Sequence, residues 1–101
     1  MEEKKNFTIK DWAEDDRPRE KMLQKGATAL SNAELLAILI STGTREESAL
    51  DLAKALLLKS SNNLDEISKL TPIELSKSVK GIGRAKAVSI SAAIELGKRM
   101  R

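Results

Sequence analysis

Residues 79–87 read Val-Lys-Gly-Ile-Gly-Arg-Ala-Lys-Ala, a glycine turn between two segments with helical patterns. Gly81 allows the first helix to end with a positive φ, and we expect Ile82 to insert its side chain between the two helices. Gly83 has no Cβ, so an anion can approach the first amides of the next helix, where the helix dipole favours negative charge. The basic side chains around this turn are Lys80, Arg84 and Lys86.

Two interpretations of this turn are open. The glycines can make a compact joint between two helices, and a Gly-x-Gly pattern alone favours that interpretation. The flanking helices, the local positive charge and Ala85, which is small enough for close contact between helices, favour phosphate binding instead. We therefore expect a phosphate-binding turn.

The positive charge of the chain lies at the end that contains the turn. Residues 77–101 carry seven basic side chains and one acidic side chain, a net charge of +6, whereas residues 1–76 carry a net charge of −3. Such a division is typical of a protein with one surface that faces a polyanion. For the terminal charges at 98–101, a solvated basic tail is the simpler interpretation.

The composition predicts an all-α fold, a compact bundle of five to six short helices. Ala, Leu, Lys and Glu are abundant, and Phe7 and Trp12 are the only aromatic residues. The chain has no Cys and no His, so no disulfide, metal site or cofactor is expected. The N-terminus lacks the pattern of a signal peptide, and the longest apolar run, residues 35–40, is too short to cross a bilayer. We expect a soluble cytoplasmic protein with no membrane contact.

Residues 1–16 are expected to form an N-terminal arm, and residues 17–101 a helical domain. Phe7, Ile9 and Trp12 would hold the arm to the domain in an extended conformation. Pro18 suits the first turn of a helix that ends near Lys25, and the glycine at position 26 suits its C-terminal stop.

Capping signals divide the remaining chain into helices. Ser31 and Glu34 form a capping box before a helix that ends near residue 41 and is closed by Gly43; since this helix is apolar on every side, it should be central. The next helix should begin at Glu46 and Glu47 and end near residue 59. One or two turns are expected over 64–70, with a cap at Asn63.

The last two helices flank the glycine turn. Thr71, Pro72 and Glu74 form a capping box with proline at the first helical position. Leu75 and Val79 should face inward before the chain stops at the turn. The final helix should run from 84 to about 99 with two apolar faces packed on neighbours, one formed by Val88, Ala92 and Leu96 and the other by Ala87, Ile90 and Ile94.

The turn resembles the hairpin of the helix-hairpin-helix superfamily, and nearly the whole chain resembles the N-terminal domain of the RadC family of bacterial proteins. The resemblance lies in residues 10–12 (Lys-Asp-Trp), 16–21 (Asp-Arg-Pro-Arg-Glu-Lys), 29–39 (Ala-Leu-Ser-Asn-Ala-Glu-Leu-Leu-Ala-Ile-Leu), 42–44 (Thr-Gly-Thr) and the glycine turn. It implies a helix-hairpin-helix domain that contacts the DNA backbone. It also implies a DNA-repair label and a following metallopeptidase-like domain of the MPN (JAB) type with a His-x-His motif.

Since this chain contains no His, that metal site lies outside it. The superfamily also has an arrangement of two hairpins joined by a helix. By that resemblance, the loop at 25–30 between the first two helices would be a degenerate copy of the glycine turn. It lacks the second glycine, so its role would be structural only.

No catalytic site is expected in this chain. Some helix-hairpin-helix glycosylases carry a Lys directly after Gly-x-Gly-Arg and an Asp downstream, but Ala85 holds the Lys position here. Lys86 is displaced by one residue, about 100° around the helix, and no Asp follows Gly83. The carboxylates at 14–16 and 46–47 could bind Mg²⁺, but a solvated arm and a helix start explain them more simply.

The sequence therefore predicts a DNA-binding module that contacts backbone phosphates without reading bases. The expected contacts are Lys80, Gly81, Ile82, Gly83, Arg84 and Lys86, with the partner DNA bound weakly. The alternative is a protein-interaction or positioning domain, with a structural hairpin, that docks on the MPN/JAB domain of the same protein or on another protein.

Overall fold

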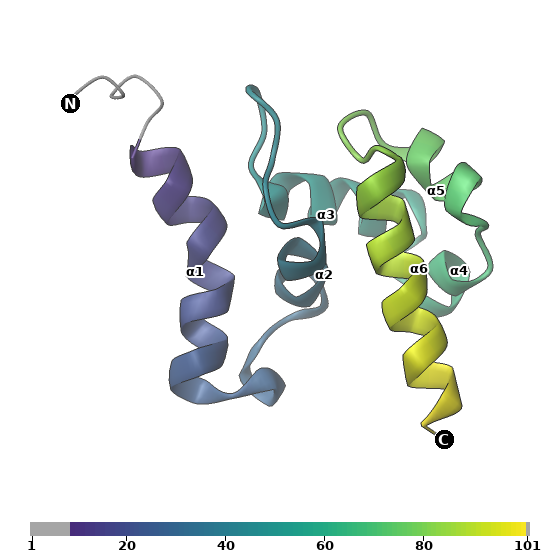
Figure 1. The fold of residues 1–101 in the computed structure, drawn as a ribbon, viewed down its shortest axis with the longest axis horizontal. Helices are drawn as coiled ribbons and strands as arrows, with labels where there is room; N and C mark the ends of the chain where they lie inside the picture. The colour runs from purple at the N-terminus through teal and green to yellow at the C-terminus, as the bar shows by residue number, and fades with distance from the viewer. Residues whose placement is uncertain (1–8, 101) are drawn as a thin grey trace.

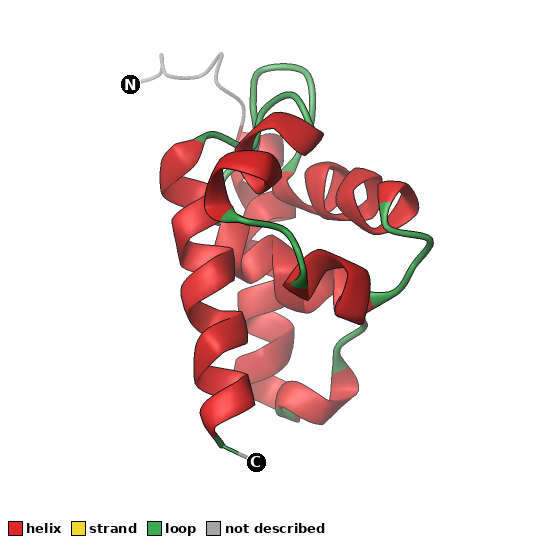
Figure 2. Cartoon of the chain, turned by 90° about the vertical axis from the view of Figure 1, so that its right-hand side faces the viewer, coloured by secondary structure: helices red, strands yellow, loops and turns green. Residues whose placement is uncertain are grey.

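The computed structural model describes the backbone of residues 9–100 and the side chains of residues 14–100. This part of the chain is all-α and contains no strand, as predicted (Figure 2). Its elements are α1 (Ile9–Lys25), a 3₁₀ turn η1 (Ala27–Ala29), α2 (Asn32–Ile40), α3 (Ala49–Lys59), α4 (Leu64–Ser68), α5 (Pro72–Ser78) and α6 (Arg84–Arg99).

Helix α2 lies at the centre and contacts α1 on one side and α3 and α6 on the others (Figure 1). Leu36, Ala37 and Ile40 are buried, and the other apolar side chains of α2 are half-buried, which confirms the central position predicted from its apolar character. The core extends into the neighbouring helices and the α5–α6 turn through Leu52, Ala53, Leu56, Ile67, Leu75, Ile82, Ala87 and Ile90.

Side-chain caps fix where α2, α3 and α5 begin. The predicted capping boxes Ser31–Glu34 and Thr71–Glu74 both form, and the structure adds a third, Ser48–Asp51, at the start of α3. The Ser31 N–H and, to a smaller extent, the Lys21 ammonium hold the pKa of Glu34 below its usual value.

The expectation that α3 begins at Glu46 and Glu47 is wrong. Helix α3 begins at Ala49, because Ser48 caps it. Glu46 and Glu47 lie in the preceding loop, where both of their N–H groups donate to the Thr44 hydroxyl, over 3.3 and 3.1 Å. The Asn63 cap of α4 forms as expected.

The prediction for the N-terminal segment is wrong in its local structure. Helix α1 begins at Ile9, and Pro18 lies inside it rather than in its first turn. Proline removes one helical hydrogen bond, but the Pro18 side chain is buried, so tertiary packing offsets that loss. Phe7 and the side chains of Ile9 and Trp12, expected to hold an extended arm in place, lie outside the described residues.

Backbone conformation at the helix ends is partly as predicted. Gly26 stops α1 with a φ of 88°, and its N–H donates to Met22 O over 2.8 Å. Helix α2 ends at Ile40, near the expected end, but Ser41, with a φ of 76°, closes it in place of Gly43. Gly43 serves a different purpose, since a Cβ there would collide with the Glu47 carbonyl and the Ser48 backbone.

Helix α6 packs on one face and not on two. Ala87 and Ile90 are buried, and Ile94 packs against the core. Val88 and Leu96, expected to pack on a neighbour, are 55% and 64% exposed, and Ala92 is exposed as well. No element of the described residues covers that face. None of the described helices is long and apolar enough to cross a membrane.

Candidate nucleic-acid interface

The glycine turn forms a tight connection between α5 and α6. Gly81 has a φ of +107°, and the Ile82 N–H donates to Val79 O over 3.0 Å. The positive φ makes any other residue strained here, and a Cβ at Gly81 would also lie 2.9 Å from the side-chain methyls Leu52 Cδ2 and Thr44 Cγ2, which would have to shift. Positive φ at Gly81 was predicted and is confirmed.

The turn is held by buried apolar side chains on both sides. Ile82 is 1% exposed and belongs to the same core cluster as Leu75 and Val79 of the α5 side and Ala87 of α6. Burial of Ile82 was predicted. Ala85, expected to allow close helix contact, is exposed, and Ala87 takes that role because it faces the core one half-turn later.

The N-terminus of α6 differs from those of α2, α3, α4 and α5. Each of those helices begins with a Ser, Thr or Asn whose side chain accepts a backbone N–H. Helix α6 begins with Gly83, which supplies no such oxygen. A Cβ at Gly83 would meet no atom within 4 Å, so the space beside the Gly83 Cα, at the start of α6, is open. Free N–H groups and the helix dipole favour an anion there.

The basic side chains predicted to contribute lie around this open end. Lys80 and Arg84 are exposed, and Lys86 is half-buried. Within the described part of the chain, none of them forms an ion pair. At the other end of α6, Arg99 Nε donates to Glu95 Oε2 over 3.0 Å, which partly neutralises the C-terminal charges. Among the described residues, Arg84 and Lys86 at the start of α6 form no ion pair, and neither does Lys98 near its end.

The acidic cluster at 14–16 does not pair with these basic residues. Asp15 instead accepts two backbone N–H groups of the segment between α2 and α3, from Gly43 over 3.1 Å and from Ala49 over 2.8 Å. Among the described residues, no group of three or more His, Cys, Asp or Glu side chains is placed to hold a metal ion.

Sequence reasoning missed the neighbour of the α5–α6 turn. The α2–α3 loop, residues 41–48, projects at the same end of the molecule as the α5–α6 turn (Figure 1), and Thr44 lies against Gly81. The α1–α2 connection, expected to be the related first hairpin, lies at the opposite end. The Thr-Gly-Thr signal at 42–44 was visible in the sequence, but it carried no information about this long-range contact.

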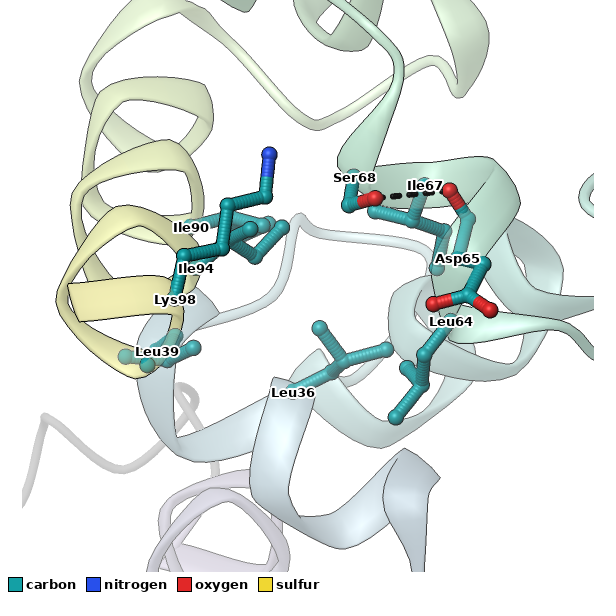
Figure 3. Close-up of a pocket in the computed structure, with 10 residues that line it drawn as sticks. Leu36, Leu39, Leu64, Asp65, Ile67, Ser68, Ile90, Ile94 and Lys98 are labelled. Carbon is teal, nitrogen blue, oxygen red and sulfur yellow. Dashed lines mark hydrogen bonds between the residues drawn. The ribbon is translucent and has the colours of Figure 1, made fainter. Parts of the chain in front are cut away.

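A groove of about 470 Å³ lies on another side of the domain, between α2, α4 and α6 (Figure 3). Its walls are mostly apolar, and Lys98, Asp65 and Ser68 lie at its edge. The apolar lining residues are Leu36, Leu39, Leu64, Ile67, Ile90 and Ile94.

A family model described as UPF0758 N-terminal matches residues 9–88. A UPF0758 protein of Flavobacterium johnsoniae is 56% identical over 96 residues, which is 95% of this chain and 41% of the relative. UPF0758 proteins of Trichlorobacter lovleyi and Alkaliphilus oremlandii are 51% and 52% identical, covering 95% and 93% of this chain and 42% and 40% of those relatives. No solved structure gives a significant match.

The chain belongs to the UPF0758 family, the RadC-like proteins. The family resemblance of the sequence is thereby confirmed, while the helix-hairpin-helix motif remains a prediction. The chain spans about two fifths of the length of the curated relatives that it matches.

Proposed function

We propose that this UPF0758 domain binds the phosphate backbone of DNA through the α5–α6 turn, without reading base sequence. The observation that carries the proposal is the start of α6, where Gly83 leaves the first amides open while the neighbouring helices are capped by side chains. In the proposed complex these amides donate to a phosphate oxygen. Lys80, Arg84 and Lys86 add attraction and release counterions.

The residues at the turn explain why binding would be weak and non-specific. The turn carries no aromatic side chain for base stacking, and it has no Asn or Gln beside it for base edges. Gly81 and Ile82 shape the turn and would contact the backbone through their main chain. A single module that contacts a few phosphates should bind with a Kd of roughly 10⁻⁴ to 10⁻⁶ M at physiological salt.

Fluorescence anisotropy with a labelled short duplex and a branched DNA, at several salt concentrations, tests the proposal. The variant Arg84→Glu/Lys86→Glu should weaken binding at least tenfold. The matched control Lys98→Glu/Arg99→Glu makes the same charge change at the other end of α6 and should weaken it far less. Equal loss in both variants would indicate a diffuse basic surface, and no binding at low salt would refute the proposal.

The groove between α2, α4 and α6 favours a second candidate function, a docking or positioning domain. The groove is apolar, and Val88 and Leu96 leave the opposite face of α6 exposed. Longer relatives contain more than twice the length of this chain, and their additional polypeptide would be the partner, including the metallopeptidase-like domain that the RadC resemblance implies. In that case substitutions in the groove, such as Ile94→Asp, would disturb the longer protein, and the charge variants of the hairpin would not.

We propose no catalytic activity for this chain. The metal chemistry implied by the family resemblance requires His ligands, and the sequence has none.

A further inference from the structure

Asp15 of α1 binds the α2–α3 loop in the way that a bound anion would. Its Oδ2 accepts the Gly43 N–H over 3.1 Å, and its Oδ1 accepts the Ala49 N–H over 2.8 Å. The two amides lie at the two ends of the loop, and both oxygens of one carboxylate are used. Two converging backbone N–H groups of this kind also suit two oxygens of a phosphate.

The loop has its own internal bonds besides those to Asp15. The Thr44 N–H donates to Glu47 O over 2.7 Å, and the Thr44 hydroxyl accepts from Glu46 and Glu47. The Ser48 N–H donates to Asp51. The backbone is closely packed at Gly43, where a Cβ would collide with Glu47 and Ser48. These bonds would keep the Gly43 and Ala49 amides in place without the carboxylate.

The described side chains of α1, residues 14–25, are attached mainly by polar contacts. Arg19 Nη2 donates to Ile38 O over 3.3 Å and to Ser41 Oγ over 3.1 Å, and Lys21 pairs with Glu34 at 3.2 Å. Among the side chains of residues 14–25, Pro18 is the buried one, and Leu23 is 87% exposed. A segment such as 14–25, whose described side chains bury little apolar area, opens at a lower free energy than the core of the same protein.

We propose that the Asp15 carboxylate occupies an oxyanion site formed by the Gly43 and Ala49 amides, and that a phosphate takes this site when α1 is displaced or Asp15 is replaced. Thr44 of the same loop lies against Gly81, so the site is next to the hairpin. Arg45 adds one positive charge to the loop, and Glu46 and Glu47 oppose an anion. Helix α1 would thus regulate the extent of the phosphate-binding surface; this last step rests on the proposed function.

Inorganic phosphate titrated into ¹⁵N-labelled protein tests the site without DNA. In Asp15→Ala, the Gly43 and Ala49 amide resonances should shift with saturation at millimolar phosphate. The control Asp16→Ala removes the same charge from the neighbouring, exposed residue, and in that variant these two resonances should not shift. A folded Asp15→Ala variant whose two amides ignore phosphate would overturn the proposal.

Thermal unfolding covers the case in which Asp15→Ala is only partly folded. A ligand that binds the folded state raises the Tm, so phosphate should raise the Tm of Asp15→Ala more than that of Asp16→Ala. Equal increases in the two variants would refute the site.

DNA anisotropy then separates this inference from the proposed function. Asp15→Ala should bind DNA roughly fivefold more tightly than Asp16→Ala, the effect of one added hydrogen bond. Suppose that the two variants bind DNA equally and that Arg84→Glu/Lys86→Glu still abolishes DNA binding. That result would refute the regulation of DNA binding by α1, and it would leave the proposed function standing. Phosphate binding at Gly43 and Ala49 in a protein that does not bind DNA would support the site and refute the proposed function.

Discussion

Replacing Gly83 by Ser should raise the stability of the domain and weaken its binding to DNA. Gly83 has φ −82° and ψ −172°, close to φ −75° and ψ 166° at the N-cap Ser31. A serine at position 83 can therefore adopt the same conformation, and its side chain enters open space. Its hydroxyl would accept the Lys86 N–H, as Ser31 accepts the Glu34 N–H over 3.1 Å.

The size of both effects follows from this geometry. Serine in place of glycine at an N-cap contributes a few tenths of a kcal/mol, and the loss of glycine freedom in the unfolded chain adds about 0.4–1 kcal/mol. Together they stabilise the fold by roughly 0.5–1.5 kcal/mol, which is a Tm increase of about 2–12 °C for a domain of this size. The new hydroxyl accepts the Lys86 N–H, which would otherwise donate to a phosphate oxygen. The loss of that one charge-assisted hydrogen bond to the phosphate weakens DNA binding about tenfold.

Thermal unfolding by circular dichroism and DNA anisotropy measure the two effects. Gly97→Ala is the matched control, because Gly97 lies at the other end of α6 and also has open space around its Cα. This control should gain stability and keep its DNA affinity. A less stable Gly83→Ser variant would contradict the cap geometry, and a stabilised variant with unchanged DNA affinity would show that these amides do not hold phosphate.

Two further predictions concern the stability cost of a side chain at Gly81 in the α5–α6 turn and the loss of folding stability at acid pH. Gly81→Ala should cost about 1–3 kcal/mol in urea unfolding, because a Cβ would be strained at φ +107° and lie 2.9 Å from Leu52 and Thr44; a cost below about 0.5 kcal/mol would contradict the turn geometry. The Ser31 N–H and Lys21 lower the pKa of Glu34 in the folded state. The ionised Glu34 carboxylate therefore stabilises the fold at a pH above the pKa that Glu34 has in the unfolded chain. This stabilisation is lost as the pH falls through the lower pKa of the folded state. Urea unfolding of Glu34→Gln between pH 6 and pH 3 should therefore show a smaller loss of stability than the parent, and parallel curves would refute this.

Local signals predicted most of the fold and the positive φ at Gly81 in the α5–α6 turn. Capping boxes at Ser31 and Thr71 marked two helix starts, and the run at 35–40 marked the central helix, because these features act within one turn of the chain. The bare start of α6 was implied by glycine at position 83, which offers no capping oxygen.

The features that the sequence did not predict depend on contacts distant in the chain. Pro18 favours a helix start locally, yet its burial keeps it inside α1. The exposed face of α6 repeats apolar residues at the same spacing as the face that packs on the core. The spacing alone does not reveal whether another helix covers a face. The contact of Thr44 with Gly81 and the hydrogen bonds of Asp15 to the α2–α3 loop join segments 28 or more residues apart, which no local signal encodes.

The most direct measurement of the central proposal is a ¹⁵N–¹H NMR titration of the 101-residue chain with a short duplex at low salt. The amides of residues 83–86 should show the largest shifts, and added salt should reverse them. Shifts concentrated at residues 98–100, or at the groove residues Leu39 and Ile94, with residues 83–86 unchanged, would contradict phosphate binding at the start of α6.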